Sequence, residues 1–114
     1  MNVQTRFVDS VIILDLTGRL DQSNALRVRQ AVIDVTEGQP AYVVVNLKGV
    51  DMLDCSGLSA LVLGLKRARE NQGNLCLCSL QSSVRMIFEL TRFDKVFEIF
   101  VCEEDAVQAA ACRY

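Results

Sequence analysis

The sequence predicts a single α/β domain, residues 1–114, with a mostly parallel β-sheet, about four helices and an antiparallel hairpin at one edge. Three observations predict this class. Short apolar runs typical of strands alternate with longer segments whose apolar residues recur at helical spacing. One run, 42–47, is apolar on both sides, as a strand must be in a helix-covered parallel sheet. At 114 residues, 51% of them hydrophobic, the chain can form one core without disulfide or metal support.

A β-hairpin is expected at the start of the chain. Its strands are the runs 5–7 and 11–16, and Asp9-Ser10 between them is a typical tight turn. The segment 17–21 then ends the second strand. Because strands joined by a short turn pair antiparallel, this hairpin should form an antiparallel edge of the sheet.

The first helix is expected over Ala25–Thr36, with Asp21 or Ser23 as its N-cap and the breaker segment 38–40 after it. Its apolar positions are Leu26, Val28, Val32 and Val35. The strand 42–47 follows, and only Asn46 interrupts its apolar run. A buried amide with satisfied hydrogen bonds is the expected structure at Asn46.

The second helix is expected to begin directly after this strand and a short acidic turn, at Asp54-Cys55-Ser56-Gly57-Leu58. The residues that give it an apolar face are Leu58, Leu61, Val62 and Leu65. The segment 71–73 should end the helix, with Gly73 at the C′ position, where glycine is favoured.

The remaining third of the chain repeats the alternation of strand and helix. We expect a strand over 74–80, a third helix over 84–91, a strand over 96–100, and a last helix from Glu103 to about Cys112. The third helix should present Val84, Ile87, Phe88 and Leu90 to the core. The order β-β-α-β-α-β-α-β-α implies right-handed crossovers between parallel strands.

Composition and charge exclude several classes of function. The chain has no histidine, so neither a Ser-His-Asp triad nor a Cys-His dyad can form, and it has no glycine-rich phosphate loop. We therefore predict no enzymatic activity and no cofactor. The net charge of −2 gives no electrostatic reason to expect nucleic-acid binding. No apolar run is long enough to span a membrane and no signal peptide is evident, so we expect a cytoplasmic protein.

The cysteines predict neither disulfides nor a metal site. Five cysteines in a protein expected in the cytosol do not suggest a disulfide framework. Cys76 and Cys78 lie two residues apart in an expected strand, so they share a face and should act as small core residues. Zinc would need further ligands, and the chain lacks histidine to supply them.

The start of the second helix is the most informative feature. Asp54, Cys55 and Ser56 place a carboxylate, a thiol and a hydroxyl where unpaired N–H groups and the helix dipole favour anions. Such a place suits a switch controlled by charge. Structural interpretations are also open: Asp54 as an N-cap and Ser56 as an ordinary first-turn residue. Gly57 should permit close packing of the helix on a strand.

Four segments resemble, in order and spacing, the STAS domain and, more closely, the bacterial anti-sigma factor antagonists. They are 18–21 (Gly-Arg-Leu-Asp), 44–47 (Val-Val-Asn-Leu), 52–58 (Met-Leu-Asp-Cys-Ser-Gly-Leu) and 88–93 (Phe-Glu-Leu-Thr-Arg-Phe). The resemblance covers nearly the whole chain. Its most specific element is Asp-x-Ser-Gly-Leu placed directly after a buried strand.

The resemblance implies a partner-switching protein with no catalytic activity. Such an antagonist, when unphosphorylated, binds an anti-sigma factor that is also a serine kinase. The kinase ends the interaction by phosphorylating a serine at the start of the second helix, and a PP2C-type phosphatase reverses the modification. The implied partner-binding residues are Asp21, Asp54, Cys55, Ser56 and Gly57. We expect a monomer or a weak dimer.

An acidic rim around the helix start is also expected. If the loops that follow the strands gather at one end of the sheet, Asp21, Asp51 and Asp54 lie near one another. An acidic rim suits a basic partner surface, and a phosphate added there would introduce repulsion at the contact.

The chain departs from the family pattern at the expected phosphate acceptor, where Cys55 replaces serine or threonine. The nearest hydroxyl is that of Ser56, one residue on and about 100° round the helix. Three interpretations follow: Ser56 is the acceptor, no acceptor remains and binding is constitutive, or Cys55 is itself regulatory through its thiol. Asp51 and Asp54 argue against the third. The alternative functions are a STAS scaffold and a small-ligand or anion-sensing module without a phosphoswitch.

Overall fold

The computed structural model describes residues 2–8, 10–37 and 40–111 and confirms the predicted order of strands and helices. The elements are β1 (Asn2–Val8), β2 (Val11–Leu20), α1 (Ala25–Thr36), β3 (Tyr42–Leu53), α2 (Cys55–Glu70), β4 (Asn74–Cys78), α3 (Ser82–Thr91), the 3-10 helix η1 (Phe93–Lys95), β5 (Glu98–Phe100) and α4 (Glu103–Ala111). Asp9, residues 38–39 and Cys112, which carry parts of the predicted turn, breaker and last helix, lie outside the described residues.

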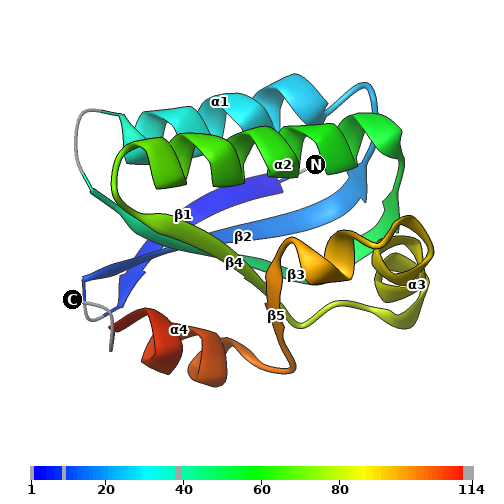
Figure 1. Ribbon diagram of the computed structural model, residues 1–114. Helices are drawn as coiled ribbons and strands as arrows, with labels where there is room; N and C mark the ends of the chain where they lie inside the picture. Colours follow the sequence, from blue (N-terminus) through cyan, green and yellow to red (C-terminus); the bar gives the residue numbers. More distant parts are fainter. Residues whose placement is uncertain (1, 9, 38–39, 112–114) are drawn as a thin grey trace.

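The strands form one mixed sheet in the order β1-β2-β3-β4-β5. β1 pairs antiparallel with β2, and every other neighbouring pair is parallel, as predicted. Helices α1, α2 and α3 cover one face of the sheet, and α4 packs on the other (Figure 1). This arrangement is the predicted α/β fold with an antiparallel hairpin at its edge.

The sheet separates two cores of unequal size. The larger core lies under α1, α2 and α3, and Phe88, Leu61 and Val32 are fully buried in it. The smaller core lies under α4 and contains Cys76 and Cys78, which are buried on one face of β4 as predicted. Burial raises the pKa of the Cys78 thiol to about 11, so this thiol stays protonated at neutral pH.

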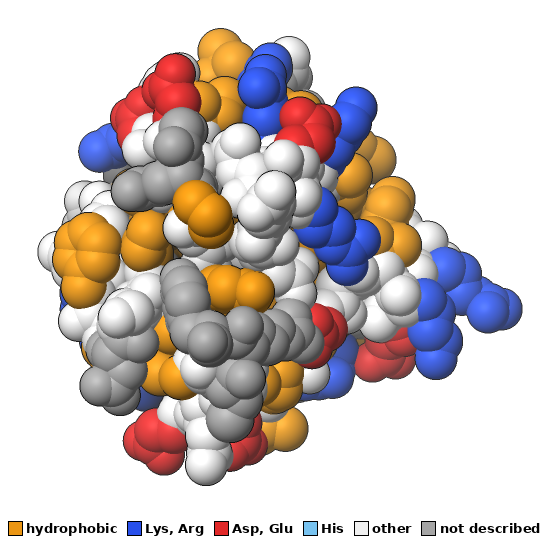
Figure 2. All heavy atoms as spheres, turned by 60° about the vertical axis from the view of Figure 1, so that its left-hand side comes forward, with side chains coloured by type: hydrophobic (Ala, Val, Ile, Leu, Met, Phe, Trp, Pro, Cys, Tyr) orange, Lys and Arg blue, Asp and Glu red, His pale blue; other side chains and the backbone are white. Residues whose placement is uncertain are grey.

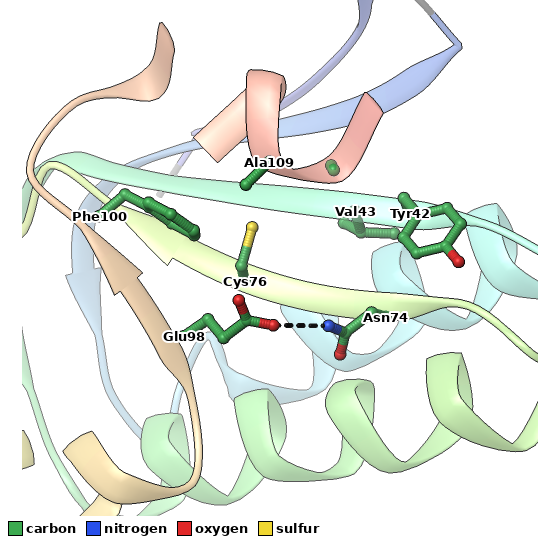
Figure 3. Close-up of a pocket in the computed structure, with 8 residues that line it drawn as sticks. Tyr42, Val43, Asn74, Cys76, Glu98, Phe100 and Ala109 are labelled. Carbon is green, nitrogen blue, oxygen red and sulfur yellow. Dashed lines mark hydrogen bonds between the residues drawn. The ribbon is translucent and has the colours of Figure 1, made fainter. Parts of the chain in front are cut away.

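A small cavity adjoins Cys76 in the smaller core. Figure 3 shows the Cys76 sulfur directed toward α4, with Glu98 and Asn74 joined by a hydrogen bond of 3.0 Å at the cavity's border. The cavity measures about 10 Å³, which is room for one water molecule at most. It is therefore a packing defect rather than a binding site.

Strands β2 and β3 are both longer than the sequence predicts, reaching Leu20 and Leu53. The added segments contain glycine and charged residues, which favour a turn by local propensity. Pairing between the two strands nevertheless continues, with shifts of register between Asp15 and Thr17 and between Gly18 and Arg19. As a result, β2 and β3 end side by side.

Two predicted core residues are exposed. Leu26 in α1 and Leu90 in α3 lie on helices with the predicted apolar spacing, yet they are 73% and 76% exposed. Val28 and Val32 of α1 are buried as predicted, and Val35 is partly buried against the core. Both leucines are outside the stripe that the sheet covers, so the prediction was wrong for them.

Several predicted ends of elements are also wrong. The N-cap of α1 is Asn24, not Asp21 or Ser23, and its side chain makes no capping bond. At the end of α2, Gln72 takes the left-handed conformation with φ 65°, where the sequence favours Gly73. Gly73 instead lies against Ala41: a Cβ there would be 1.9 Å from the Ala41 carbonyl oxygen. The strands predicted over 74–80 and 96–100 are shorter, Asn74–Cys78 and Glu98–Phe100.

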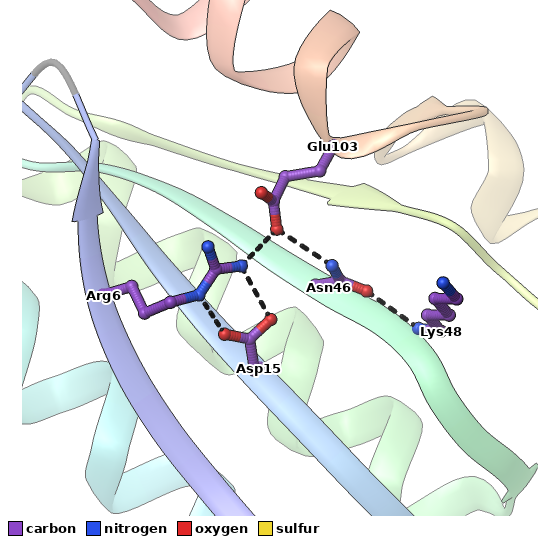
Figure 4. Close-up of polar contacts among 5 residues, drawn as sticks. All are labelled: Arg6, Asp15, Asn46, Lys48 and Glu103. Carbon is purple, nitrogen blue, oxygen red and sulfur yellow. Dashed lines mark hydrogen bonds and ion pairs between the residues drawn. The ribbon is translucent and has the colours of Figure 1, made fainter.

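A polar cluster fastens α4 to the sheet (Figure 4). Arg6 of β1 forms ion pairs with Asp15 of β2 and Glu103 of α4, and these hydrogen bonds raise its pKa. Glu103 also accepts a 2.9 Å hydrogen bond from the Asn46 amide. The Asn46 carbonyl oxygen accepts from the Lys48 N–H over 2.9 Å, so the amide is satisfied as predicted, although only partly buried.

Charges of both signs are mixed on the surface. On the face drawn in Figure 2, basic side chains lie mainly on the right-hand side with some acidic ones among them, and further acidic side chains lie at the upper left and the bottom. Within the described ranges, no helix combines the length and apolar character that crossing a membrane requires.

Candidate functional site

Strand pairing places the start of helix α2 at one end of the sheet. Leu20 and Leu53, the last residues of β2 and β3, are register partners in the parallel ladder. Asp21 and Asp54 follow them directly, so both lie at the same end of the sheet. The backbone N–H of Asp54 donates to the Leu20 carbonyl over 3.2 Å and extends this contact by one residue.

Asp54 is the N-cap of α2, as predicted, and both of its carboxylate oxygens accept backbone hydrogen bonds. Oδ1 accepts from the N–H of Gly57 over 2.9 Å, which is the capping bond. Oδ2 accepts from the N–H of Gln22 over 3.1 Å, in the turn that precedes α1. One side chain therefore fixes the start of α2 and the neighbouring turn together.

Gly57 allows α2 to approach β2 closely, which confirms its predicted role. A Cβ at this position would lie 2.3 Å from the Leu20 carbonyl oxygen and 2.7 Å from the Leu20 Cγ. Such distances would force the strand and helix apart. Because the N–H of Gly57 is also the one that Asp54 caps, cap and close approach act at the same residue.

The two candidate switch residues differ in exposure. Cys55, the first residue of α2, is exposed, whereas Ser56 is partly buried. The side chains point in directions about 100° apart around the helix axis. The position that the family pattern assigns to the phosphate acceptor is thus the more accessible one, and here it carries a thiol.

Two of the three predicted rim aspartates lie together. The residues that line one shallow depression at the sheet end are Arg19, Asp21, Gln22, Ser23, Met52 and Asp54. Asp51 lies elsewhere, exposed on β3, and its carbonyl accepts a 3.2 Å hydrogen bond from the Ser83 hydroxyl at the start of α3. The acidic rim therefore consists of Asp21 and Asp54, with Asp51 on the side toward α3.

Asp21 is held by its own turn. Its Oδ1 accepts from the Ser23 hydroxyl over 2.6 Å and from the Ser23 N–H over 3.1 Å, and Arg19 lies 3.7 Å from Oδ2. These contacts, chiefly the hydrogen bond from the Ser23 hydroxyl, keep the pKa of Asp21 below its ordinary value. Asp21 therefore contributes a negative charge to the depression at neutral pH, beside the positive charge of Arg19.

An apolar groove beside Cys55 is a feature that the sequence does not predict. It has a volume of about 470 Å³, and its lining residues are Cys55, Leu58, Ser59, Val62, Leu63, Lys66, Thr91 and Phe93. A second hollow of about 440 Å³ shares Val62 and Lys66 with it and reaches Arg69 and Val96. Leu63, an apolar residue outside the predicted core face of α2, is a signal of this groove in the sequence.

Known proteins match most of this chain, and three of them illustrate the likeness. BtrV of Bordetella bronchiseptica, a provisional anti-sigma factor antagonist, is 29% identical over 102 residues, which cover 90% of this chain and 88% of BtrV. An anti-sigma factor antagonist from Mycobacterium paratuberculosis has a crystal structure with a TM-score of 0.86 and 24% identity, covering 96% of this chain and 92% of that one. The phosphorylated form of the Bacillus cell fate determinant SpoIIAA has a TM-score of 0.73 and 15% identity, covering 95% and 98%.

The family model of the STAS domain matches residues 2–106. This range holds the entire sheet, the helices α1, α2 and α3, and the α2 start at Asp54. The fold, the matched range and the relatives agree, and the chain belongs to the STAS domain family.

Proposed function

We propose that this protein is an anti-sigma factor antagonist, a binding protein without catalytic activity that acts in the cytoplasm. Its partner is an anti-sigma factor that is also a serine kinase. The observation that carries the proposal is the braced start of α2, where Asp54 fixes both the helix and the adjacent turn beneath exposed Cys55. A rigid, accessible helix start suits recognition by a partner, because little conformational freedom is lost on binding.

The surroundings of this helix start indicate the chemistry of the contact. On one side lies the acidic depression at Asp21 and Asp54, and on the other the apolar groove at Leu63 and Phe93. A partner surface with basic residues beside an apolar segment complements both. We therefore expect Leu63→Lys to weaken binding at least tenfold in calorimetry, with Gln108→Lys, exposed on α4, as the matched control.

Phosphorylation of Ser56 is the proposed switch. A phosphate adds about −1.5 to −2 charges at the helix start, beside Asp21 and Asp54. Its bulk and added charge would disrupt a contact fitted to the unmodified helix start, with repulsion from any acidic group of the partner nearby. The phosphorylated SpoIIAA structure supports this proposal, since that protein carries the modification on the same fold. A PP2C-type phosphatase would restore the binding form.

A second candidate is constitutive binding without any switch. The observation that favours it is the difference in exposure: the accessible position carries the Cys55 thiol, and the Ser56 hydroxyl is partly buried. The two candidates differ in which protein the kinase can phosphorylate: the wild type in the first, and only a variant with a hydroxyl at position 55 in the second.

Incubation with the cognate kinase and ATP, followed by mass spectrometry, separates the two candidates. If Ser56 is the acceptor, the wild type gains one phosphate and Ser56→Ala gains none. If the switch is lost, only Cys55→Ser, which puts a hydroxyl at the exposed position, is modified. Ser56→Asp should weaken partner binding at least tenfold in the first case, whereas Gln108→Asp should not. Absence of any binding to such a kinase would contradict the antagonist function and favour a scaffold or a small-ligand sensor.

A further inference from the structure

The two edges of the sheet are protected very differently. An edge strand presents unpaired N–H and C=O groups, which proteins usually shield with short strands, proline, lysine or bulges. The edge strand β5 spans only 3 residues, Glu98–Phe100. The other edge, β1, spans 7 residues, Asn2–Val8, without proline or lysine, and pairs with β2 in an unbroken register.

The only charged residue of β1 does not shield its free edge. Arg6 is directed across the sheet, where it pairs with Asp15 of β2 and Glu103 of α4 (Figure 4). The Arg6 side chain is therefore held over β2 by its ion pairs, and no charged side chain of β1 lies along the outer edge of the strand.

The register shows which backbone groups point outward. Val8 and Val11 are register partners with two residues between them in the sequence, and a pair placed in this way exchanges hydrogen bonds. Hydrogen-bonded and non-hydrogen-bonded pairs alternate along an antiparallel ladder. The N–H and C=O groups of Val3, Thr5 and Phe7 therefore point away from β2, toward the free edge.

The side chains of β1 leave an apolar residue uncovered. Phe7 lies beside Ile12 on the helix-covered face, yet it is 73% exposed. Val3 lies on the same face, partly buried against the core. If a second β1 pairs antiparallel with Thr5 opposite Thr5 of the partner subunit, Phe7 lies opposite Val3 of the partner subunit. The exposed ring then gains an apolar cross-strand neighbour.

We propose that β1 is a homodimer edge, at which two copies pair β1 to β1 about a two-fold axis through Thr5. This register uses the whole strand and joins all the outward groups of Val3, Thr5 and Phe7. An axis at Arg6 would place two arginines opposite each other, and an axis at Val3 or Phe7 would leave most of β1 unpaired. The contact consists of one strand of 7 residues from each copy, so the dimer is weak and depends on concentration.

Pairing through β1 does not depend on the antagonist function, but it would affect how the α2 starts are presented to a partner. A two-fold axis between antiparallel strands stands normal to the sheet, so the helix-covered faces of both copies lie on one side of a continuous sheet. The dimer therefore presents two α2 starts on the same side.

Sedimentation velocity over two decades of protein concentration tests the proposal, in reducing buffer because Cys55 is exposed. The wild type should change from monomer to dimer as concentration rises. Thr5→Pro should stay monomeric, because it removes an N–H that points outward while sparing the bonds to β2. Thr5→Val, the matched control, should dimerise like the wild type. A wild type that is monomeric throughout, or Thr5→Pro that still dimerises, would overturn the proposal.

A charge series at Gln4 tests the register itself and does not depend on the folding of the proline variant. Gln4 lies opposite Arg6 of the partner subunit in the dimer, and opposite Asp15 within its own chain. Gln4→Glu should therefore strengthen dimerisation several-fold, and Gln4→Lys should weaken it several-fold. Effects on monomer stability should have the opposite sign, because of Asp15. If neither variant changes the strength of dimerisation, or if Gln4→Lys dimerises more strongly than Gln4→Glu, this register is contradicted.

Discussion

Helices α1 and α2 begin at the same end of the sheet, after two strands whose last residues are register partners, yet their starts are built differently. One residue, Asp54, separates α2 from β3, and its side chain accepts hydrogen bonds from Gly57 and from Gln22 in the turn before α1. Four residues, 21–24, separate α1 from β2, and Asn24 caps α1 without a side-chain bond.

The difference shows that the start of α2 stabilises the turn before α1, whereas the turn before α1 adds little to the start of α2. The turn before α1 is held by short local bonds, chiefly between Asp21 and Ser23, and by Asp54 from the other helix. The start of α2 depends on its own cap and on the close contact of Gly57 with Leu20. Changes at α2 should therefore disturb both helix starts, whereas changes at α1 should remain local.

The largest effect is expected from Gly57→Val. A side chain there would overlap the Leu20 carbonyl, so the helix must move away from β2. We expect a loss of about 3 kcal/mol or more in the free energy of unfolding, measured with urea. Ser59→Val is the matched control, because Ser59 is exposed on the same helix. Equal losses in the two variants would mean that close packing at Gly57 does not matter.

Asp54→Ala should come next. It removes the capping bond and the bond to Gln22, for a total loss of about 2 kcal/mol. Asp54→Asn keeps one acceptor oxygen and should lose less. Hydrogen exchange adds a sharper readout: the amides of Gln22 and Gly57 should both lose protection in Asp54→Ala. Loss at Gly57 alone would show that the two starts are not coupled.

Asp21→Asn should have a smaller effect that depends on pH. The pKa of Asp21 is lower in the folded protein, so its carboxylate stabilises the fold above the unfolded-state pKa of about 4. This contribution is lost as pH falls through the lower, folded-state value. The stability difference between wild type and Asp21→Asn should therefore be present at pH 7 and shrink in acid. If the stability difference between the two proteins grows as pH falls, the carboxylate of Asp21 does not stabilise the fold.

The smallest effect is expected from Cys55→Ala. Cys55 is exposed at the first position of α2, so the change should stay within about 0.5 kcal/mol in urea unfolding. A loss comparable with that of Asp54→Ala would show that the thiol contributes to the fold. Near-neutrality would show that Cys55 contributes little to the stability of the fold, in contrast to its neighbour Asp54.

The sequence predicts the parts of this site that depend on short-range patterns. Asp54 as a cap and Gly57 as a packing residue follow from a polar residue and a glycine placed directly after a buried strand. Leu26 and Leu90 show the limit of such patterns, because helical spacing does not reveal how much of a helix the sheet covers.

Features that join distant segments could not be predicted from local patterns. The extension of β3 to Leu53 depends on pairing with β2, which overrides the turn propensity of Gly49 and Asp51. The bond from Gln22 to Asp54 joins residues 32 positions apart. The groove likewise combines α2 with Phe93, which only the folded chain brings together.

The geometry at Asp54 also restricts which amino acid can occupy this position. Serine, threonine, asparagine and aspartate all serve as ordinary N-caps, because one acceptor oxygen is enough. Here two backbone N–H groups, from Gly57 and Gln22, approach from different segments. Only a short side chain with two acceptor oxygens meets both, since a hydroxyl offers one oxygen and an amide would turn a donor toward one of them. Substitution tolerance at this position should therefore separate aspartate from every other capping residue.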